Sequence, residues 1–242
     1  MITPTPASRS ELLELTGRHP FVALTSRDEL TAYHRNGSWV WMSLGPWGPQ
    51  TMALGEPAEI LPLLADLHRQ GSIAGRRLHV PRTTRELVAA HFEASDFADW
   101  DLLWSVTPPP AARGEDMVEE LPADAAPEIG GLLDEALPDS GARPGDQDVR
   151  AWYGIRDEGR LVAVAADRSP GDMVAHIAGI AVAPDRQGRG LGAAITVALT
   201  LRLFAEYPTV SLGVMSDNDR AVALYERLGF SERLARTSFT VR

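Results

Sequence analysis

The chain alternates between short apolar runs, typical of strands, and longer segments whose apolar residues recur with helical spacing. Between residues 124 and 137, for example, Ile129, Leu132 and Leu133 fall on one helical face. The pattern in the second half predicts, in order, a strand at 117–121, a helix at 124–137, strands at 152–155, 160–166 and 173–182, a helix at 190–206, a strand at 210–214, a helix at 218–228 and one or two strands at 233–241. This order predicts a mixed α/β fold.

The first half has a similar order. Its pattern predicts strands at 39–44 and 51–54, a helix at 58–69, a strand at 78–80, a helix at 84–92 and a strand at 100–106. The segment VPRTTRELVAAHFEASDF at 80–97 can be aligned with VMSDNDRAVALYERLGF at 214–230 if one gap is allowed. A diverged internal repeat would explain this likeness, and so would the generic similarity of strand-helix units.

A proline-rich segment separates the two halves. Pro108, Pro109 and Pro110 are consecutive, and such a run neither continues a helix nor donates to a sheet ladder. We therefore expect an N-terminal α/β domain at 1–107, a linker at 108–114 and a C-terminal domain at 115–242.

Composition narrows the classes of partner and cofactor. The 242 residues are 44% hydrophobic and carry a net charge of −10, which disfavours nucleic acid as a partner. The chain has no cysteine and no lysine, so disulfides, thiolate metal sites and Schiff-base lysines are excluded. No apolar run is long enough for a signal peptide or a membrane span. We expect a cytoplasmic protein without a metal cofactor or a membrane partner, as a monomer or homodimer.

The glycine-rich stretch IAGIAVAPDRQGRGLG at 177–192 carries the clearest chemistry. A strand runs into a loop and then a helix, and glycines there let successive backbone N–H groups turn toward one anion, with the helix N-terminus behind them. A tight packing turn is the simpler alternative. The glycine spacing does not fit a dinucleotide fingerprint, and a Walker loop needs a lysine.

These residues resemble the signature of the GNAT superfamily of N-acetyltransferases, [R/Q]-x-x-G-x-[G/A]. Gln187, Gly190 and Gly192 match it, after Val182-Ala183-Pro184, and a second family block is present as NDRA at 218–221 and YERLGF at 225–230. The resemblance covers about 115–242 and implies the GNAT acyl-CoA N-acyltransferase fold. If the first half is a repeat, the protein is a tandem with a degenerate first copy.

The resemblance implies a role for each matching residue. The expected cofactor contacts are Ile180, Ala181 and Val182 for the pantetheine arm, Gln187, Gly188, Arg189, Gly190, Leu191, Gly192 and Ala193 for the pyrophosphate, and Asn218 at the start of the last helix. Asn218 also fits a plain helix cap. Tyr225 is the expected proton donor to the departing sulfur, or an aromatic residue of the core. His176 is the candidate general base, or a structural strand histidine.

The activity implied is transfer of an acetyl group from acetyl-CoA, as co-substrate, to a primary amine of a small molecule or peptide by direct attack on the thioester. Two alternatives stay open. One is a module that senses acyl-CoA without turnover, and the other is an acyltransferase with a different acyl group or acceptor.

The N-terminal half has Leu54-Gly55-Glu56-Pro57-Ala58 in place of the glycine loop, so we expect it not to bind coenzyme A.

Two further features bear on the acceptor. The tryptophans of the N-terminal half are either core residues or an aromatic wall for an acceptor; they are Trp39, Trp41, Trp47, Trp100 and Trp104. The segment 115–148, in which the family has its first two helices, holds 11 acidic residues and one arginine. It either attracts a cationic amine or is a solvated face.

Overall fold

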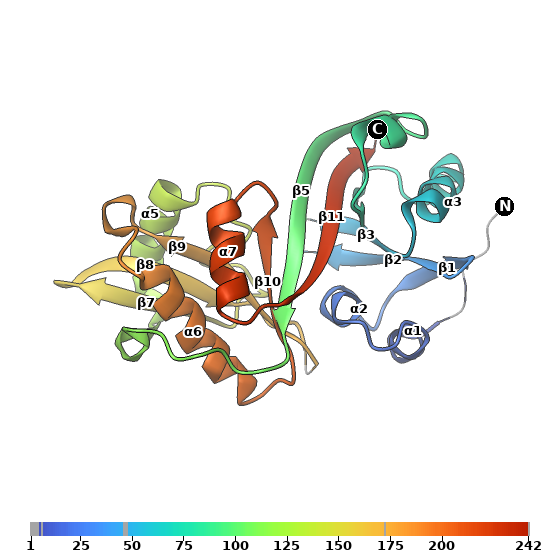
Figure 1. The fold of residues 1–242 in the computed structure, drawn as a ribbon. Helices are drawn as coiled ribbons and strands as arrows, with labels where there is room; N and C mark the ends of the chain where they lie inside the picture. Colours follow the sequence, from blue (N-terminus) through green and yellow to red (C-terminus); the bar gives the residue numbers. More distant parts are fainter. Residues whose placement is uncertain (1–4, 6, 46–47, 172, 242) are drawn as a thin grey trace. The chain divides into compact units, whose positions relative to one another are not determined.

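The computed structural model describes residues 5, 7–45, 48–171 and 173–241, and they form two compact units (Figure 1). The first unit comprises Met1–Leu102, Val214–Asn218 and Leu234–Arg242, and the second comprises Leu103–Gly213 and Asp219–Arg233. Trp47 lies outside the described residues. The domain boundary expected at 108–114 stays a prediction, because these units change at residue 102 and the first unit includes two C-terminal segments.

The first unit is a mixed sheet with helices, and its strands are ordered β1-β2-β3-β4-β11-β5. Its elements are α1 (Arg9–Leu15), α2 (Pro20–Thr25), β1 (Thr31–Arg35), β2 (Ser38–Gly45), β3 (Gly48–Leu54), α3 (Pro57–Arg69), β4 (Arg77–Pro81), α4 (Arg85–Ala89), β5 (Ala94–Ser105) and β11 (Glu232–Val241). The core lies between the sheet and α3, where Ile60, Leu64, Leu78 and Phe239 are fully buried.

The second unit has the strand order β10-β9-β8-β7-β6. Its elements are β6 (Glu119–Leu121), α5 (Ala126–Ala136), β7 (Ala151–Asp157), β8 (Arg160–Asp167), β9 (Ala175–Val182), α6 (Leu191–Phe204), β10 (Val210–Met215) and α7 (Asp219–Arg227). Every residue of β8 from Leu161 to Asp167 is buried, because α5 and α6 both pack on this part of the sheet. The hairpin between β7 and β8 turns at Glu158 and Gly159, both with positive φ.

The last strand of the chain belongs to the sheet of the first unit. β11 runs antiparallel to β4, with Phe239 opposite Leu78, and lies beside β5 (Figure 1). The pattern at 233–241 predicts one or two strands, and the structure has one. The segment follows the second unit in the sequence but completes the first in space.

Three N-terminal elements have no counterpart among those expected from the pattern. They are α1, α2 and β1, of which α1 begins with a capping box between Ser8 and Glu11. The Ser-x-x-Glu spacing is the signal that would have revealed this helix. In addition, α4 is shorter than the helix expected at 84–92, and β5 begins earlier than the strand expected at 100–106.

The two halves of the chain share one order of elements. The order β2-β3-α3-β4-α4-β5 is matched by β8-β9-α6-β10-α7-β11. In each set the hairpin's second strand pairs in parallel with the strand after the helix. Three residues of β3 pair with β4, ending at Met52 and His79, and three of β9 pair with β10, ending at Ile177 and Leu212. This shared pairing supports the internal repeat.

Candidate active site

The two central strands of the second unit separate partway along their length. β9 and β10 pair at residues 175–177 and 210–212, and the register between them extends no further among the described residues. The remainder of β9, from Ala178 to Val182, therefore has one edge without a strand partner. Unpaired peptide groups at such an edge can bind an extended ligand in the manner of an added strand.

A bulge at Gly179 bends β9 where the separation begins. Val164 and Ala166 of β8 lie opposite Ala181 and Ala178, so two residues of β9 face one of β8. Gly179 has φ +59°, and a Cβ there would lie 3.0 Å from the Trp152 ring. The position therefore needs glycine. A bulge of this kind redirects the strand that follows, here toward the glycine loop.

The glycine loop is arranged to hold an anion through the main chain. Gly188 and Gly190 have φ of +79° and +85°, and Gly190 is the N-cap of α6 without any side-chain cap. The backbone N–H groups of residues 188 to 193 have no acceptor among the residues that the structure describes. The first turn of a helix also carries partial positive charge, so the geometry of this exposed loop suits a phosphate group. Its role as the pyrophosphate site stays a prediction.

The strand end, the loop and α7 meet at Gly192. A Cβ added there would lie 3.6 Å from Leu224 Cδ2 and 3.8 Å from Val182 Cγ2. The expected pantetheine residues Ile180 and Val182 are partly exposed here, whereas the Ala181 side chain is buried. The arrangement brings the expected pyrophosphate loop next to the expected pantetheine strand within one unit.

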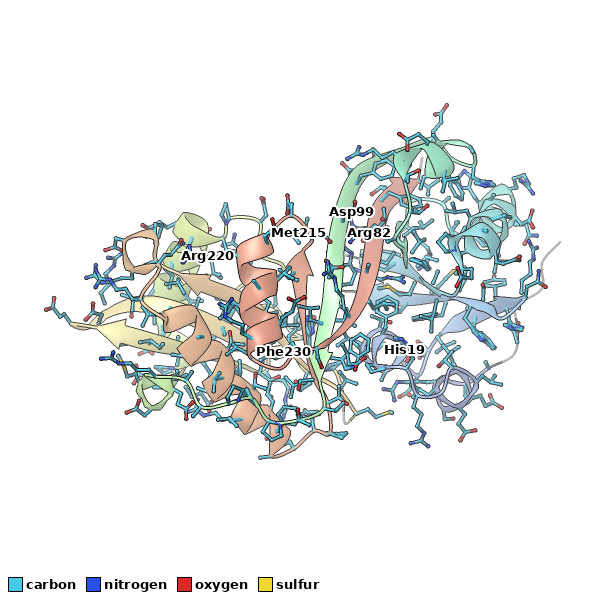
Figure 2. The ribbon with its side chains drawn as sticks, viewed as in Figure 1. His19, Arg82, Asp99, Met215, Arg220 and Phe230 are labelled. Atoms are coloured by element: carbon cyan, nitrogen blue, oxygen red, sulfur yellow. The ribbon has the colours of Figure 1, made fainter. Side chains whose placement is uncertain are left out.

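Three arginines near the loop, Arg186, Arg189 and Arg220, differ in their partners. Arg186 pairs with Asp157 at 2.8 Å and with Asp185 at 2.7 Å, so its charge is neutralised. Arg189, in contrast, is exposed and forms no ion pair with any described residue. Arg220 of α7, labelled in Figure 2, donates to Gln187 Oε1 at 3.5 Å. Gln187 Nε2 donates to the Val182 carbonyl at 3.2 Å.

Arg220 is a residue beside the loop that the family motif does not single out. The sequence feature that could have revealed it is a basic residue in the first turn of a helix, where an acidic residue interacts better with the helix dipole. A bound anion near this turn would offset that unfavourable interaction.

Tyr225 is buried on α7. Its side chain is 7% exposed, and its ring packs edge-on against Phe230 at 6.2 Å between centroids. Burial raises the pKa of the phenol to about 12, so it stays protonated at neutral pH. Within the described part of the chain no group bonds to its hydroxyl. The ring is a core residue, and the hydroxyl is a donor without a partner, so the two interpretations of Tyr225 are compatible.

His176 lies in the paired part of β9, opposite Ser211 of β10. Its Nδ1 is 3.0 Å from the Ser211 hydroxyl, and burial lowers the pKa of the imidazole to about 4. The ring is neutral at pH 7 and is a weak base, poorly matched to an ammonium group of pKa near 10. The role of His176 as general base stays a prediction.

The lowered pKa of His176 predicts how the stability of the protein depends on pH. An unfolded histidine binds a proton near pH 6.5, whereas the folded His176 does so only near pH 4. Its contribution to folding is therefore complete above pH 6.5 and is lost as the pH falls toward 4. We expect His176→Gln to reduce the acid-induced fall in unfolding free energy by about 2 kcal/mol at pH 5, measured by denaturant unfolding at pH 7 and pH 5.

The matched control for this measurement is His34→Gln, because His34 is exposed on β1. That variant should keep the full fall in stability between pH 7 and pH 5. An unchanged pH dependence in His176→Gln would contradict the environment described for this ring.

Asn218 directly precedes α7. Its backbone N–H donates to the Met215 carbonyl at 3.0 Å, closing the turn after β10. The contact with the cofactor stays a prediction.

Five of the eleven acidic residues of the segment 115–148 form ion pairs. Arg156 binds both Glu119 and Glu128, at 3.2 and 2.7 Å. Further pairs are Asp134 with Arg143, Glu135 with Arg160 and Asp148 with Arg168. These five carboxylates have structural partners, and the role of the segment toward an acceptor stays a prediction. The segment contains one α-helix, α5, where the family resemblance implies two.

The tryptophans of the first unit are mostly structural. Trp39 and Trp41 are 7% and 0% exposed, which confirms them as core residues. Trp100 is partly exposed, and its indole N–H donates to Ser238 at 2.7 Å.

Comparison with known proteins identifies the unit that contains the loop. The model described as "Acetyltransferase (GNAT) family" matches residues 116–230. Residues 116–230 form a GNAT acetyltransferase domain. A mycothiol acetyltransferase of Streptomyces coelicolor is 37% identical over 128 residues, covering 48% of this chain and 40% of that protein. The chain thus spans less than half the length of the curated relatives it matches.

Solved GNAT structures resemble the whole chain in fold. A GCN5-related N-acetyltransferase from Kribbella flavida has a TM-score of 0.54 at 17% identity, covering 96% of this chain and 92% of its own. A tandem GNAT protein from the clavulanic acid biosynthesis pathway has a TM-score of 0.51 at 15% identity, covering 99% and 97%. The mixed α/β GNAT fold is therefore confirmed, and its likeness to a tandem protein agrees with the repeated order of elements.

Two further findings concern membrane-spanning helices and metal-binding clusters. No helix in the described ranges is both long and apolar enough to cross a membrane. Among the same residues, no three His, Asp or Glu side chains are grouped so as to hold a metal ion.

Proposed function

We propose that this protein is an acetyl-CoA-dependent N-acetyltransferase that acetylates a primary amine of a small molecule or peptide. The observation that carries the proposal is the unpaired edge of β9 leading into a loop whose N–H groups, from Gly188 to Ala193, lack acceptors. A thioester attached to a long diphosphate-bearing arm fits this arrangement. Curated relatives named mycothiol acetyltransferases support a small-molecule acceptor.

In this proposal each part of the site has one task. The loop and Arg189 bind the pyrophosphate, and the free edge of β9 holds the pantetheine arm beside it. Asn218, at the start of α7, contributes a further contact to the cofactor. A peptide N–H of the bulged strand, from Ile180 to Val182, donates to the thioester oxygen as it becomes negative.

The acceptor attacks as a neutral amine. Its nitrogen forms a bond to the carbonyl carbon, the carbon–sulfur bond breaks, and the nitrogen loses one proton while the sulfur leaves as a thiolate. Because His176 has a pKa of about 4 and is a weak base, we propose that exclusion from water lowers the pKa of the ammonium group, which releases its proton to solvent before the attack. The proton that the nitrogen loses as the amide forms passes through water to the thiolate.

Tyr225 acts at the sulfur. A phenol with a pKa of about 12 is a much weaker acid than an ordinary thiol, whose pKa is about 8.5. Complete proton transfer to the free thiolate is therefore uphill. The phenol instead donates a hydrogen bond to the sulfur as negative charge develops there, which lowers the barrier to breaking the carbon–sulfur bond.

Release of free coenzyme A across a panel of amines tests the proposal. The panel spans amino acids, polyamines, aminoglycosides, peptides with free N-termini and mycothiol lacking its acetyl group. A thiol reagent detects coenzyme A without background because the chain has no cysteine. For the mycothiol precursor, which has its own thiol, the acetylated product is measured by mass. We expect at least one amine to raise the release rate about 100-fold or more over buffer.

The alternatives are separated in the same experiment. Binding of acetyl-CoA without release for any acceptor would indicate a sensor of acyl-CoA. Turnover that is faster with a longer acyl-CoA would indicate an acyltransferase of another chain length. No binding of acetyl-CoA would refute the assignment of the loop.

A further inference from the structure

A buried guanidinium lies on one face of the sheet of the first unit. Arg236 of β11 is 0% exposed. Its Nη2 donates to the carbonyl oxygens of Ala53 on β3 at 2.6 Å and His79 on β4 at 2.5 Å. Its Nε and Nη1 have no partner. The side chain therefore joins two strands through one nitrogen and leaves the donors on the other two unused.

The charge of Arg236 lacks a counter-ion among the described residues. Burial is the one cause of its lowered pKa, which at about 9 leaves the group charged at neutral pH, and no carboxylate offsets it. The Phe21 ring lies 4.3 Å from Cζ and supplies only partial negative charge, as do the two carbonyls. The pKa values of His19 and His79 are lowered mainly by burial of the two rings, and the second largest cause for both is the positive charge of Arg236.

More unused donors lie along the same face. Trp41, Met52, His79 and Ser238 are opposite one another on β2, β3, β4 and β11. Trp41 packs against Phe21 at 5.6 Å between ring centroids, and Phe21 contacts Arg236. The indole nitrogen of Trp41 is buried and has no acceptor. Since an indole N–H can only donate, it adds to the unmet demand for acceptors.

His79 Nε2 is a donor in the tautomer that carries the ring proton there. Trp100 donates to Ser238 Oγ at 2.7 Å, and the Ser238 hydroxyl, 2.7 Å from His79 Nδ1, can donate its own proton to that nitrogen. Burial lowers the pKa of His79 to about 3, so the ring is neutral, and when Ser238 donates to Nδ1 the ring proton is on Nε2. This nitrogen has no partner in the structure.

This face of the sheet thus presents donors and one positive charge without matching acceptors. Buried polar atoms are normally satisfied, and a buried charge without a partner is costly. Water molecules would supply acceptors but no negative charge. If Arg236 only joined the two strands, its Nη2 atom would be enough, and Nε and Nη1 would not need to be free. A bound anion would supply both of the missing features, acceptors for the unused donors and a negative charge for the guanidinium.

We propose that the first unit binds a small molecule through a carboxylate group, held by Arg236 with Trp41 and His79 as further donors. One buried guanidinium matches the single charge of a carboxylate, whereas a phosphate at neutral pH carries a larger charge. The Phe21 ring contacts the guanidinium, Trp41 packs against Phe21, and Trp100 packs against His79, so an apolar body on the carboxylate suits the site. This inference goes beyond acetyl transfer in the second unit.

Binding of benzoate to the full-length protein tests this site. Benzamide is the neutral match to benzoate, and inorganic phosphate is the alternative anion. Intrinsic tryptophan fluorescence and the thermal unfolding midpoint report binding, because Trp41 and Trp100 lie at the site. We expect a saturable response to benzoate, no response to benzamide at the same concentration, and a weaker response to phosphate.

Variants locate the response. Trp41→Phe keeps an aromatic ring at this position but removes the indole N–H donor, and should lower benzoate affinity about ten-fold. Arg236→Met keeps the length of the side chain and should abolish the response. Should Arg236→Met fail to fold, His79→Gln serves as the second variant, again with affinity reduced about ten-fold. A merely structural role would change the unfolding midpoint of these variants without changing affinity.

Three results would overturn the proposal. The first is no saturable response of the wild-type protein to benzoate. The second is an unchanged affinity in Trp41→Phe together with either of the other variants, which would place the response elsewhere. The third is tighter binding of phosphate than of benzoate, which would reject the carboxylate assignment.

Discussion

A Gly190→Leu variant should lose measurable affinity for acetyl-CoA. Gly190 has φ +85° and open space around its Cα, so a side chain there meets no protein atom but covers the N–H groups of the loop. The left-handed conformation also costs a bulky residue about 1–2 kcal/mol. Loss of two charge-assisted hydrogen bonds corresponds to a drop in affinity of about 100-fold or more, measured by calorimetry.

Gly159→Leu is the matched control for this variant. Gly159 has φ +83° and equally open surroundings, but it lies in the turn between β7 and β8. The same backbone strain is introduced in the same unit, away from the loop. We expect the control to lose stability and keep acetyl-CoA affinity. Equal affinities in the two variants would reject the loop as the pyrophosphate site.

Tyr225→Phe should lower kcat by about 100-fold, because the departing sulfur loses its hydrogen-bond donor. The KM for acetyl-CoA should change by less than about two-fold, since the phenol is used only as charge develops on sulfur. The hydroxyl has no partner in the described structure, so its removal leaves no protein group unsatisfied. Steady-state kinetics with the best acceptor of the panel provides both constants.

The corresponding control is Tyr207→Phe. Tyr207 is buried to the same extent as Tyr225, but its hydroxyl accepts a hydrogen bond from Arg150. We expect this variant to lose stability and retain kcat. A Tyr225→Phe variant with normal kcat, alongside intact binding of acetyl-CoA, would remove Tyr225 from the mechanism.

The absence of lysine has a consequence for how the protein binds phosphate. A Walker loop uses a lysine as a point charge, whereas residues 188–193 present main-chain N–H groups with Arg189 and Arg220 nearby. Binding through the main chain depends on φ and ψ more than on side-chain charge. Glycine substitutions should therefore affect binding more than substitution of either arginine.

The sequence alone predicted the loop and the elements around it. The glycines of residues 187–192 act through local backbone conformation, and apolar spacing reflects local amphipathicity, so both are visible in a short window. The repeated order of elements is visible for the same reason. The roles of Tyr225, His176 and the cofactor residues came from the family resemblance, and they stay predictions.

Tertiary structure decided the features that depend on distant residues. Strand pairing uses main-chain hydrogen bonds that look alike in every sequence, so the position of β11 between β4 and β5 is not encoded in its own pattern. The separation of β9 from β10 likewise requires both strands to be in place. The same holds for His176 with Ser211, and for Arg236, whose unpaired buried charge emerges only when β3, β4 and α2 close around it. The secondary structure of a segment can be predicted from its own residues. Burial and charge pairing cannot, because they depend on residues distant in sequence that folding brings into contact.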